Sequence, residues 1–519
     1  MKSSEAGTTT INLERRQRPM SALRWILAGN IVQRALSLVG IMLMARLVTE
    51  VEFGAYRQLL SLHLVLFVLL PLGMDQLLVR EVDSRDNYLS PLWGGLFLCS
   101  LTMAAALLLG HAWVVSLLKL KAWSFLVWLV PVTIMVQGAK LWYKVLLVAR
   151  LDYKTMAVGE TSYVIVSNVL GVAALLLWPK AATLYIAYLA AECAEFLYLR
   201  FHIGHPLPPI LKAVNGFFKP FLQHKHFCLF FCADQMLNTL GGQAPVLILG
   251  ALAGKEFAAA YSMANWLVMI PLLLLIGALS RVAFPVLAAM KPEALRRQIL
   301  EILHAMAALV VPVLFYIAIM AHPLVAIVLG SQYLQTAVPI IQWLVIFSVF
   351  VTLFSPISSL DILNDRADVG FYWNAATCVL RIAALIIGLH FSLIIAIATY
   401  SVVSLIMWLL WGWVLAWLMK MNLKDFSWPW VQVTPLWAVL VVLLLMVHLV
   451  PPVPFLGPRL QPFFSCAIAA IPMLVYAGLL YWKFPATFKV ALRFINRKRS
   501  GFGPPAGDEA TVSTERIAQ

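Results

Sequence analysis

Four basic side chains interrupt apolar stretches that are long enough to cross a membrane: Arg34, Lys140, Arg281 and Arg381. A charge at the centre of a membrane helix costs roughly 2.5–3.5 kcal/mol on insertion scales. Such residues therefore face protein or a water-filled cavity, and they often mark the path of a substrate or an ion. Because arginine makes permanently charged, bidentate contacts, these residues predict the binding of a phosphate or carboxylate group inside the membrane.

Other polar residues follow the buried charges at helical spacing. The polar stripes are Asn30, Arg34 and Ser37, then Gln137, Lys140 and Lys144, and finally Asn374, Cys378 and Arg381. Each set lies on one helical face, which must point at protein or water rather than lipid. We predict that the substrate-binding residues are Asn30, Arg34, Lys140, Lys144, Arg281 and Arg381.

Carboxylates lie within the apolar stretches as well. Glu192 and Glu195 share a helical face with Tyr185 and Tyr188, and Asp234 lies in the apolar segment 223–250. These three carboxylates are the predicted sites of ion or proton coupling, because they can hold counter-ions or take up protons. Alternatively, the buried acids and bases pair with one another and join the helices. The sequence leaves both interpretations open.

The composition requires an all-α membrane protein that crosses the bilayer many times. Of 519 residues, 62% are hydrophobic and only 12% are charged, far from the roughly 25% charge of a soluble domain. The apolar runs are continuous rather than alternating, which excludes an outer-membrane barrel. The six cysteines lie in apolar runs without a ligand set for a metal, so we expect packing roles, and no metal or cofactor.

Fourteen segments are apolar and long enough to span a bilayer. They are residues 21–48, 55–80, 91–118, 122–149, 153–178, 181–201, 223–250, 257–288, 299–321, 335–357, 370–389, 392–419, 432–450 and 462–482. We predict a V-shaped transporter in five parts. These are a cytoplasmic tail (1–20), an N-lobe of helices 1–6 (21–210), a C-lobe of helices 7–12 (211–420), helices 13–14 (421–482) and a basic cytoplasmic tail (483–519).

Lysine and arginine orient the predicted bundle. With the N-terminus inside, 26 basic residues fall on the inner side and five on the outer side, which places both termini in the cytoplasm. The net charge of +15 is thus a topology signal, and we expect no nucleic-acid partner. Arg46 and Arg57 lie near outer helix ends, where we expect them to reach the interface. Residues 202–222 form the longest predicted internal loop, and no soluble domain is available for catalysis.

A faint internal repeat supports two related lobes. "VEFGAYRQL" after the first helix and "KEFAAAYSM" after the seventh lie about 204 residues apart. Each places Glu-Phe, small residues and Tyr at the outer turn into the next helix. Internal repeats of this kind are typical of transporters.

The segments "MLMARLVTEVEFGAYRQLL", "LLPLGMDQLLVRE", "ILGALAGKEFAAAYSMA" and "IVLGSQYLQTAVPIIQWL" resemble those of a known family. It is the Wzx-type polysaccharide flippases, within the multidrug/oligosaccharidyl-lipid/polysaccharide exporter superfamily. The resemblance covers roughly residues 20–420, and "KEFAAAY" lacks the glycine usual in that turn.

The resemblance implies alternating access and the transfer of an undecaprenyl-pyrophosphate-linked oligosaccharide to the periplasmic leaflet of a bacterial inner membrane. The product would serve exopolysaccharide, O-antigen or capsule synthesis. It further implies a cationic lumen, ion coupling in some members, contacts with membrane lipids, and a polysaccharide polymerase and glycosyltransferases as partners.

Three other functions compete with the flippase. One is a scaffold for a biosynthetic complex, which would not need buried charge. A cation-coupled multidrug exporter of the same superfamily would favour an acidic pocket, whereas this membrane interior is rich in basic residues. A membrane glycosyltransferase or polymerase could use Asp361, Asp365 and Asp368 of "DILNDRADVG" to bind a metal–nucleotide sugar. Solvated loop charge accounts for these aspartates more simply, and we predict that the chain is not an enzyme.

Overall fold

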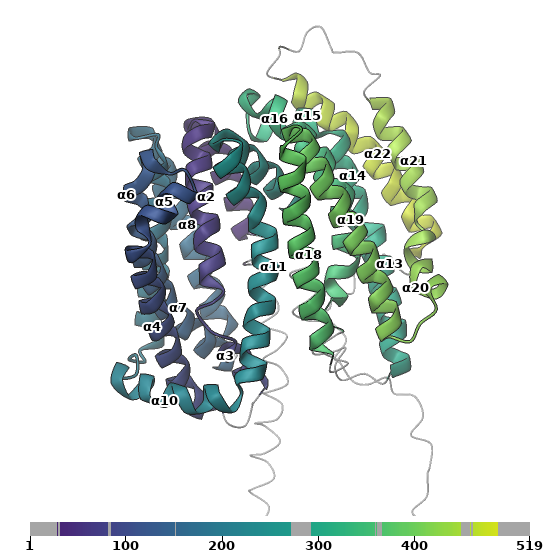
Figure 1. The fold of residues 1–519 in the computed structure, drawn as a ribbon. Helices are drawn as coiled ribbons and strands as arrows, with labels where there is room; N and C mark the ends of the chain where they lie inside the picture. Colours follow the sequence, from purple (N-terminus) through teal and green to yellow (C-terminus); the bar gives the residue numbers. More distant parts are fainter. Residues whose placement is uncertain are drawn as a thin grey trace, which may run out of the picture.

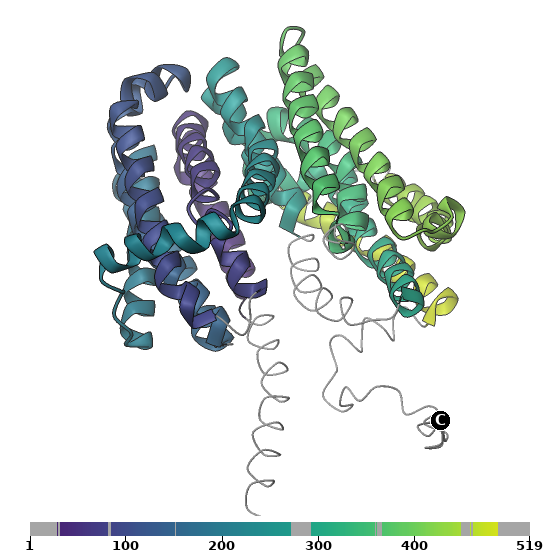
Figure 2. The ribbon, with the colours of Figure 1, turned by 60° about the horizontal axis from the view of Figure 1, so that its bottom comes forward.

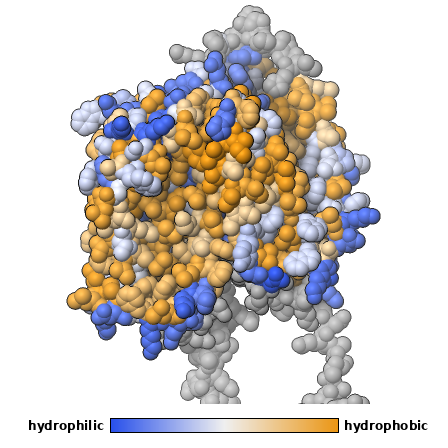
Figure 3. Space-filling view, viewed as in Figure 1, coloured by the Kyte–Doolittle hydropathy of each residue, from blue (hydrophilic) through white to orange (hydrophobic). Residues whose placement is uncertain are grey.

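The computed structural model describes residues 29, 32–80, 85–150, 152–270, 292–358, 360, 366–447, 457 and 460–485. Throughout these ranges the regular structure is helical and contains no strand. Figure 1 shows two helical bundles side by side, with the C-terminal helices against the outside of the second. Figure 3 shows an apolar belt around the middle and polar residues toward both ends, as expected for a protein that spans a bilayer.

The N-lobe consists of the helices that precede residue 204. They are a helix over residues 32–47, α2 (Glu50–Phe67), α3 (Met74–Arg80), α4 (Arg85–Leu109), α5 (His111–Leu117), α6 (Ser124–Val127), α7 (Leu129–Arg150), α8 (Tyr153–Leu177) and α9 (Ala181–Ile203), with a 3-10 turn η2 (Lys121–Trp123). Helices α4, α7, α9 and α8 pack in that order. One hydrophobic core, centred on residues such as Leu59, Trp142 and Tyr185, holds this lobe together.

The C-lobe follows with its own core. Its helices are α11 (Lys225–Leu252), a helix over residues 255–270, α13 (Pro292–Leu309), α14 (Val311–Ile319), α15 (Ala321–Val328), α16 (Leu334–Phe354), α18 (Ala367–Leu389) and α19 (Leu393–Leu418), with 3-10 turns η3 (Ser331–Tyr333) and η4 (Ser355–Ile357). Helix α11 contacts both α18 of its own lobe and α2 of the N-lobe. The second core spans this lobe and the C-terminal helices.

The C-terminal helices are part of the second bundle. They are α20 (Leu423–Val431), α21 (Thr434–Val447) and α22 (Gln461–Lys483). Trp437 of α21 donates from Nε1 to the carbonyl of Ala307 at 3.0 Å, and the Tyr476 hydroxyl of α22 donates to the carbonyl of Ala308 at 2.8 Å. Because both donors are buried and both acceptors belong to α13, these bonds fix α21 and α22 against α13.

The all-α membrane fold predicted from the sequence is confirmed, and each of the fourteen expected segments contains helix. Ten of the described helices are long and apolar enough to cross a membrane. Helices α2 and α11 are not among those ten, so the number of fourteen spans stays a prediction. The tails 1–20 and 486–519 lie outside the described residues.

The predicted loop over 202–222 is wrong, because most of it forms α10 (Ile210–Gln223). This helix runs across the end of the N-lobe rather than along the bundle (Figures 1 and 2), and it packs on α4. We call the end of the molecule at α10 the basic end, and the end at α5 and α15 the opposite end. The sequence predicts that the basic end is cytoplasmic.

Candidate functional site

A cluster of five buried or half-buried charges lies inside the N-lobe, where α7, α8 and α9 meet. Lys140 of α7 contacts Glu192 and, at 2.8 Å, Glu195 of α9. Lys144, one turn further along α7, contacts Glu195 at 2.8 Å and Glu160 of α8 at 3.4 Å. Helical spacing explains the arrangement. The two lysines are four residues apart and share one face of α7, and Glu192 and Glu195 are three residues apart and share the facing side of α9. We call these five residues the N-lobe charge cluster.

The interior of the cluster is almost dry. Lys140 is 6% exposed, Glu192 is 3% exposed and Glu195 is 1% exposed. Desolvation of an isolated ion costs several kcal/mol even after relaxation, so each charge here depends on its partners. With two lysines and three glutamates, the cluster has one acidic charge in excess when all five are ionised.

A chain of neutral hydrogen bonds extends the cluster toward α2. His63 of α2 shares a hydrogen bond between Nε2 and Gln137 Oε1 at 2.8 Å, and Gln137 donates from Nε2 to the Tyr188 hydroxyl at 2.8 Å. The Tyr163 ring of α8 lies 5.4 Å from the Lys140 ammonium, which is within cation–π range. The polar stripe on α7 therefore connects three neighbouring helices.

These contacts bring together two sets of residues to which the sequence assigned different roles. Lys140 and Lys144 are predicted to bind substrate, whereas Glu192 and Glu195 are predicted to couple an ion. The structure pairs them with each other, as the alternative interpretation of the sequence expected. Their roles in transport stay predictions.

Within the described part of the C-lobe, the buried polar residues form no such ion pairs. Asp234 of α11 accepts a hydrogen bond at 2.7 Å from the amide of Asn374 on α18. On α18 the Arg381 guanidinium lies 5.9 Å from the centroid of the Phe347 ring. Its Nε is shielded from solvent and has no hydrogen-bond partner among the described residues. Asn374 and Arg381 therefore do lie on one interior stripe, as predicted.

The remaining predicted site residues are placed only in part. Arg34 is half-buried in the helix over residues 32–47, next to Gln33, which donates from Nε2 to Thr161 Oγ1 of α8 at 3.3 Å. Asn30 and Arg281 lie outside the described residues. Their predicted substrate contacts stay untested.

Arg57 is a functional candidate that sequence reasoning missed. We expected it to reach the outer interface, but its Nε is shielded from solvent and has no hydrogen-bond partner in the described part of the chain. The sequence feature that indicates an interior position is the i, i+4 spacing of Arg57 and Ser61 on α2, which places both polar residues on one face. Arg46, by contrast, is exposed and bonds the carbonyl of Ile327 on α15.

Hydrogen bonds between the lobes close the opposite end of the molecule. Lys255, the first residue of the helix over 255–270, donates from Nζ to Gln58 Oε1, to the carbonyl of Leu118 at 2.6 Å and to the carbonyl of Gly250 at 2.8 Å. Gln58 in turn donates from Nε2 to the carbonyl of Leu247 at 3.0 Å. Since Gln58 and Leu118 belong to the N-lobe, one ammonium joins both lobes. We call this set the interlobe contact.

Close backbone packing supports the interlobe contact. A Cβ on Gly54 would lie 1.7 Å from the Lys255 carbonyl oxygen, so only glycine fits there. Gly54 and Lys255 come from the two copies of the internal repeat, which meet at this point. On α2, one helical turn after Gln58, the Ser61 hydroxyl donates to Gln243 Oε1 of α11 at 2.9 Å.

The environment of Lys255 destabilises its charged form. Burial, and next the charge of Lys119, lower the pKa of Lys255 to about 8.

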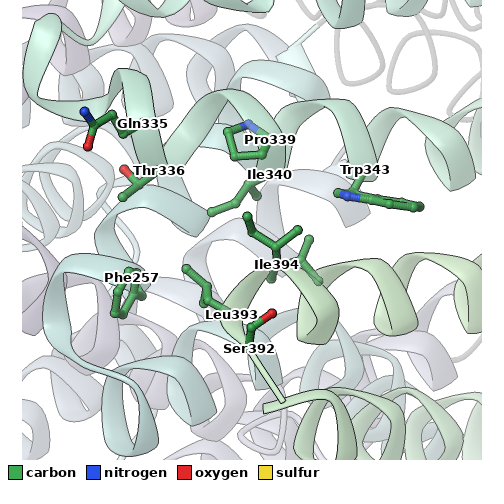
Figure 4. Close-up of a pocket in the computed structure, with 10 residues that line it drawn as sticks. Phe257, Gln335, Thr336, Pro339, Ile340, Trp343, Ser392, Leu393 and Ile394 are labelled. Atoms are coloured by element: carbon green, nitrogen blue, oxygen red, sulfur yellow. The ribbon is translucent and has the colours of Figure 1, made fainter. Parts of the chain in front are cut away.

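A small groove opens on the C-lobe near the opposite end, between the helix over 255–270, α16 and α19. Its volume is about 350 Å³. Figure 4 shows Gln335, Thr336 and Phe257 toward one end of it and Trp343 toward the other. Most of its lining is aliphatic or aromatic and carries no charge, so it lacks the residues needed to hold an anionic group.

The described residues offer no group of three His, Cys, Asp or Glu side chains that could hold a metal ion. Four of the six cysteines are buried, as packing residues are. The aromatic side chains Trp142 and Tyr185 are also fully buried.

The fold defines the class of protein. Over 88% of this chain and 98% of the other, it is similar to a structure described as lipid II flippase MurJ in an inward closed conformation, with a TM-score of 0.65 and 14% identity. An inward-facing multidrug resistance MATE family transporter of the MOP superfamily matches over 75% of this chain and 96% of its own, with a TM-score of 0.56 and 14% identity. The chain thus has the two-lobed fold of these transporters.

The sequence defines the family within that class. Residues 43–338 match the family described as polysaccharide biosynthesis protein, and the chain belongs to this family. The teichuronic acid biosynthesis protein TuaB of Bacillus subtilis (strain 168) is 23% identical over 78% of this chain and 84% of its own. The lipopolysaccharide biosynthesis protein WzxC of Escherichia coli (strain K12) is 23% identical over 72% of this chain and 75% of its own. The predicted family is confirmed.

Proposed function

We propose that this protein is a flippase that moves a lipid-linked oligosaccharide from the cytoplasmic to the periplasmic leaflet of a bacterial inner membrane. The observation that carries the proposal is its membership of the polysaccharide biosynthesis family, together with a fold like that of a lipid II flippase. The two-lobed bundle provides the means, since substrate can pass between lobes that open alternately to each side.

Among lipid-linked oligosaccharides, the proposed substrate is an oligosaccharide repeat unit on an undecaprenyl-pyrophosphate carrier. Arg381 and Arg57 support this assignment, because each places a shielded guanidinium nitrogen in the interior without a hydrogen-bond partner among the described residues. A guanidinium binds pyrophosphate oxygens in a bidentate manner. Arg34, Arg281 and Asn30, with Lys140 and Lys144, complete the proposed set.

Transport requires the interlobe contact to open. The three bonds of Lys255 and the bond between Ser61 and Gln243 are hydrogen bonds, and within the described residues no ion pair joins the lobes. A neutral hydrogen bond contributes about 0.5–1.5 kcal/mol net, and a bond from a charged group such as the Lys255 ammonium about 1.5–3 kcal/mol. The contact is therefore strong enough to close one side and weak enough to release it.

Ion coupling is assigned to the N-lobe charge cluster and to Asp234. Protonation of Glu192 or Glu195 would remove a partner of Lys140 and expose its charge to an arriving pyrophosphate. In this scheme the cluster changes between an internally paired state and a substrate-paired state. The protein needs no catalytic residue, metal or cofactor for these steps.

The multidrug exporter is the second candidate, because the fold is also similar to a multidrug transporter. The two functions differ in the charge of the substrate that the interior would receive. The C-lobe interior presents Arg381, which disfavours a cationic drug. The family membership favours the flippase.

The test is Arg34→Ala in the native host. We expect the protein to insert normally, export of polysaccharide to stop, and the lipid-linked unit to accumulate on the inner leaflet. Arg34→Lys should restore little export if bidentate phosphate contact matters. Normal export by Arg34→Ala would contradict the proposed role of the buried arginines.

A further inference from the structure

Helix α10 carries exposed apolar side chains although it does not span the membrane. It has 14 residues, about 21 Å of helix at 1.5 Å per residue, and it runs across the basic end of the N-lobe (Figures 1 and 2). Leu211 is 81% exposed, Phe218 is 49% exposed and Leu222 is 59% exposed. At i, i+7 and i+11 these three lie on one face.

The N-lobe itself holds α10 in this orientation. Ala213 and Phe217 are buried against α4. There a Cβ on Gly94 would lie 2.1 Å from the Ala213 carbonyl oxygen, and a Cβ on Gly95 would lie 2.6 Å from the Phe217 ring. The two glycines thus form a slot for the helix. Trp93 of α4 holds the segment just before α10, because its Nε1 donates a hydrogen bond to the carbonyl of Pro208 at 3.1 Å.

A second exposed stripe on α10 is basic. Lys212 and Lys219 are exposed and lie seven residues apart, so they project from the same side. The helical rotation places this stripe about a quarter turn from the apolar stripe, and the buried face lies on the remaining side. No acidic residue lies between Ile210 and Gln223.

We infer that α10 is a docking surface for the anionic phospholipids of the cytoplasmic leaflet. Its apolar stripe of Leu211, Phe218 and Leu222 enters the acyl boundary, and Lys212 and Lys219 contact lipid phosphates. Interfacial helices combine these two features, buried apolar area and a basic face. A lysine near an anionic leaflet contributes about 1 kcal/mol, which is about fivefold in affinity. The predicted cytoplasmic position of the basic end places α10 at that leaflet.

The docking surface has a mechanical consequence. Helix α10 is packed on the N-lobe, and the chain passes through His224 into α11 of the C-lobe. A lipid-anchored α10 therefore keeps one end of the N-lobe at the interface while α11 moves. The C-lobe then rocks against an N-lobe that stays fixed relative to the leaflet.

The test measures lipid binding by the full chain with native mass spectrometry. Phosphatidylglycerol is titrated against phosphatidylcholine for the unmodified protein and for Lys212→Gln/Lys219→Gln. We expect the double variant to lose roughly 25-fold in phosphatidylglycerol affinity, with no change for phosphatidylcholine. The matched control is Lys420→Gln/Lys424→Gln, which removes two exposed lysines beyond α19. Equal phosphatidylglycerol affinity for both double variants would overturn the inference.

A second measurement separates a lipid surface from a protein-binding surface. A spin label is placed at Asn215→Cys, an exposed position beside the apolar stripe, after the six native cysteines are replaced. In vesicles containing phosphatidylglycerol we expect the label to be accessible to oxygen and shielded from a water-soluble nickel complex. A label that the nickel complex reaches as easily as one at Lys424→Cys would place α10 in water, and would instead favour a cytoplasmic protein as the partner.

Discussion

In the N-lobe, Lys140 and Lys144 contact three glutamates, whereas in the C-lobe Asp234 accepts from an amide and Arg381 lies beside a phenylalanine ring. The members of the N-lobe charge cluster satisfy one another, whereas the Nε of Arg381 has no hydrogen-bond partner among the described residues. Buried charge alone therefore does not identify a binding site. A paired charge stabilises the bundle, and an incompletely paired one remains available to a ligand.

The largest expected effect comes from breaking the N-lobe charge cluster. Lys140→Met leaves Glu192 without its lysine in a dry interior, and removal of one partner of a buried ion pair costs about 3–5 kcal/mol. Thermal unfolding in detergent should show a marked loss of stability. Lys140→Met combined with Glu192→Gln should recover much of it, because the uncompensated charge is gone. If Lys140→Met unfolds at the same temperature as the unmodified protein, these ion pairs do not stabilise the N-lobe.

A different result is expected in the C-lobe, where Arg381→Gln should reduce transport and leave stability almost unchanged. A hydrogen bond to a charged group contributes about 1.5–3 kcal/mol, so the rate of lipid-linked oligosaccharide transfer should fall roughly tenfold or more. Arg57→Gln should behave in the same way. Arg381→Lys, which keeps the charge without the planar fork, is the matched control and should retain part of the rate. Full transport by Arg381→Gln would remove this residue from the proposed site.

A substitution in the interlobe contact should shift the equilibrium between the closed and the open state of the opposite end. Lys255→Met removes three hydrogen bonds and should favour opening of the opposite end by about 1–3 kcal/mol. In a chain without native cysteines, labelling of Ser61→Cys by an impermeant thiol reagent should become roughly tenfold faster. Lys121→Met, an exposed lysine at the same end, should leave the labelling rate unchanged. Equal rates for both variants would contradict the proposed closure.

The smallest effect is expected at the hydrogen bond between Asn374 and Asp234. Asn374→Ala removes a donor at 2.7 Å, but Asp234 is only half-buried and Gln235 also donates to it at 3.4 Å. The loss of unfolding free energy should be about 1 kcal/mol. Chemical denaturation in detergent measures it, and a loss as large as that of Lys140→Met would erase the difference between the lobes.

The sequence predicted the membrane fold and most of its elements, because twenty-residue apolar runs have few other solutions. It also predicted the polar stripes on α7, α9 and α18, since helical spacing alone defines a face. It could not predict that Lys140 meets Glu192, because this depends on how α7 packs on α9. Helix α10 was missed for a related reason. The prolines in and before it are typical of a loop. The slot formed by Gly94 and Gly95 of α4 depends on tertiary packing, which the sequence does not show.

Reconstitution of the purified chain in vesicles measures directly whether it transfers a lipid-linked oligosaccharide between leaflets. An undecaprenyl-pyrophosphate-linked oligosaccharide is placed in one leaflet, and its arrival in the other is followed with a glycosidase that cannot cross the membrane. We expect rapid transfer by the unmodified protein and at least about tenfold slower transfer by Arg381→Gln. Transfer by the unmodified protein that is no faster than in protein-free vesicles would contradict it.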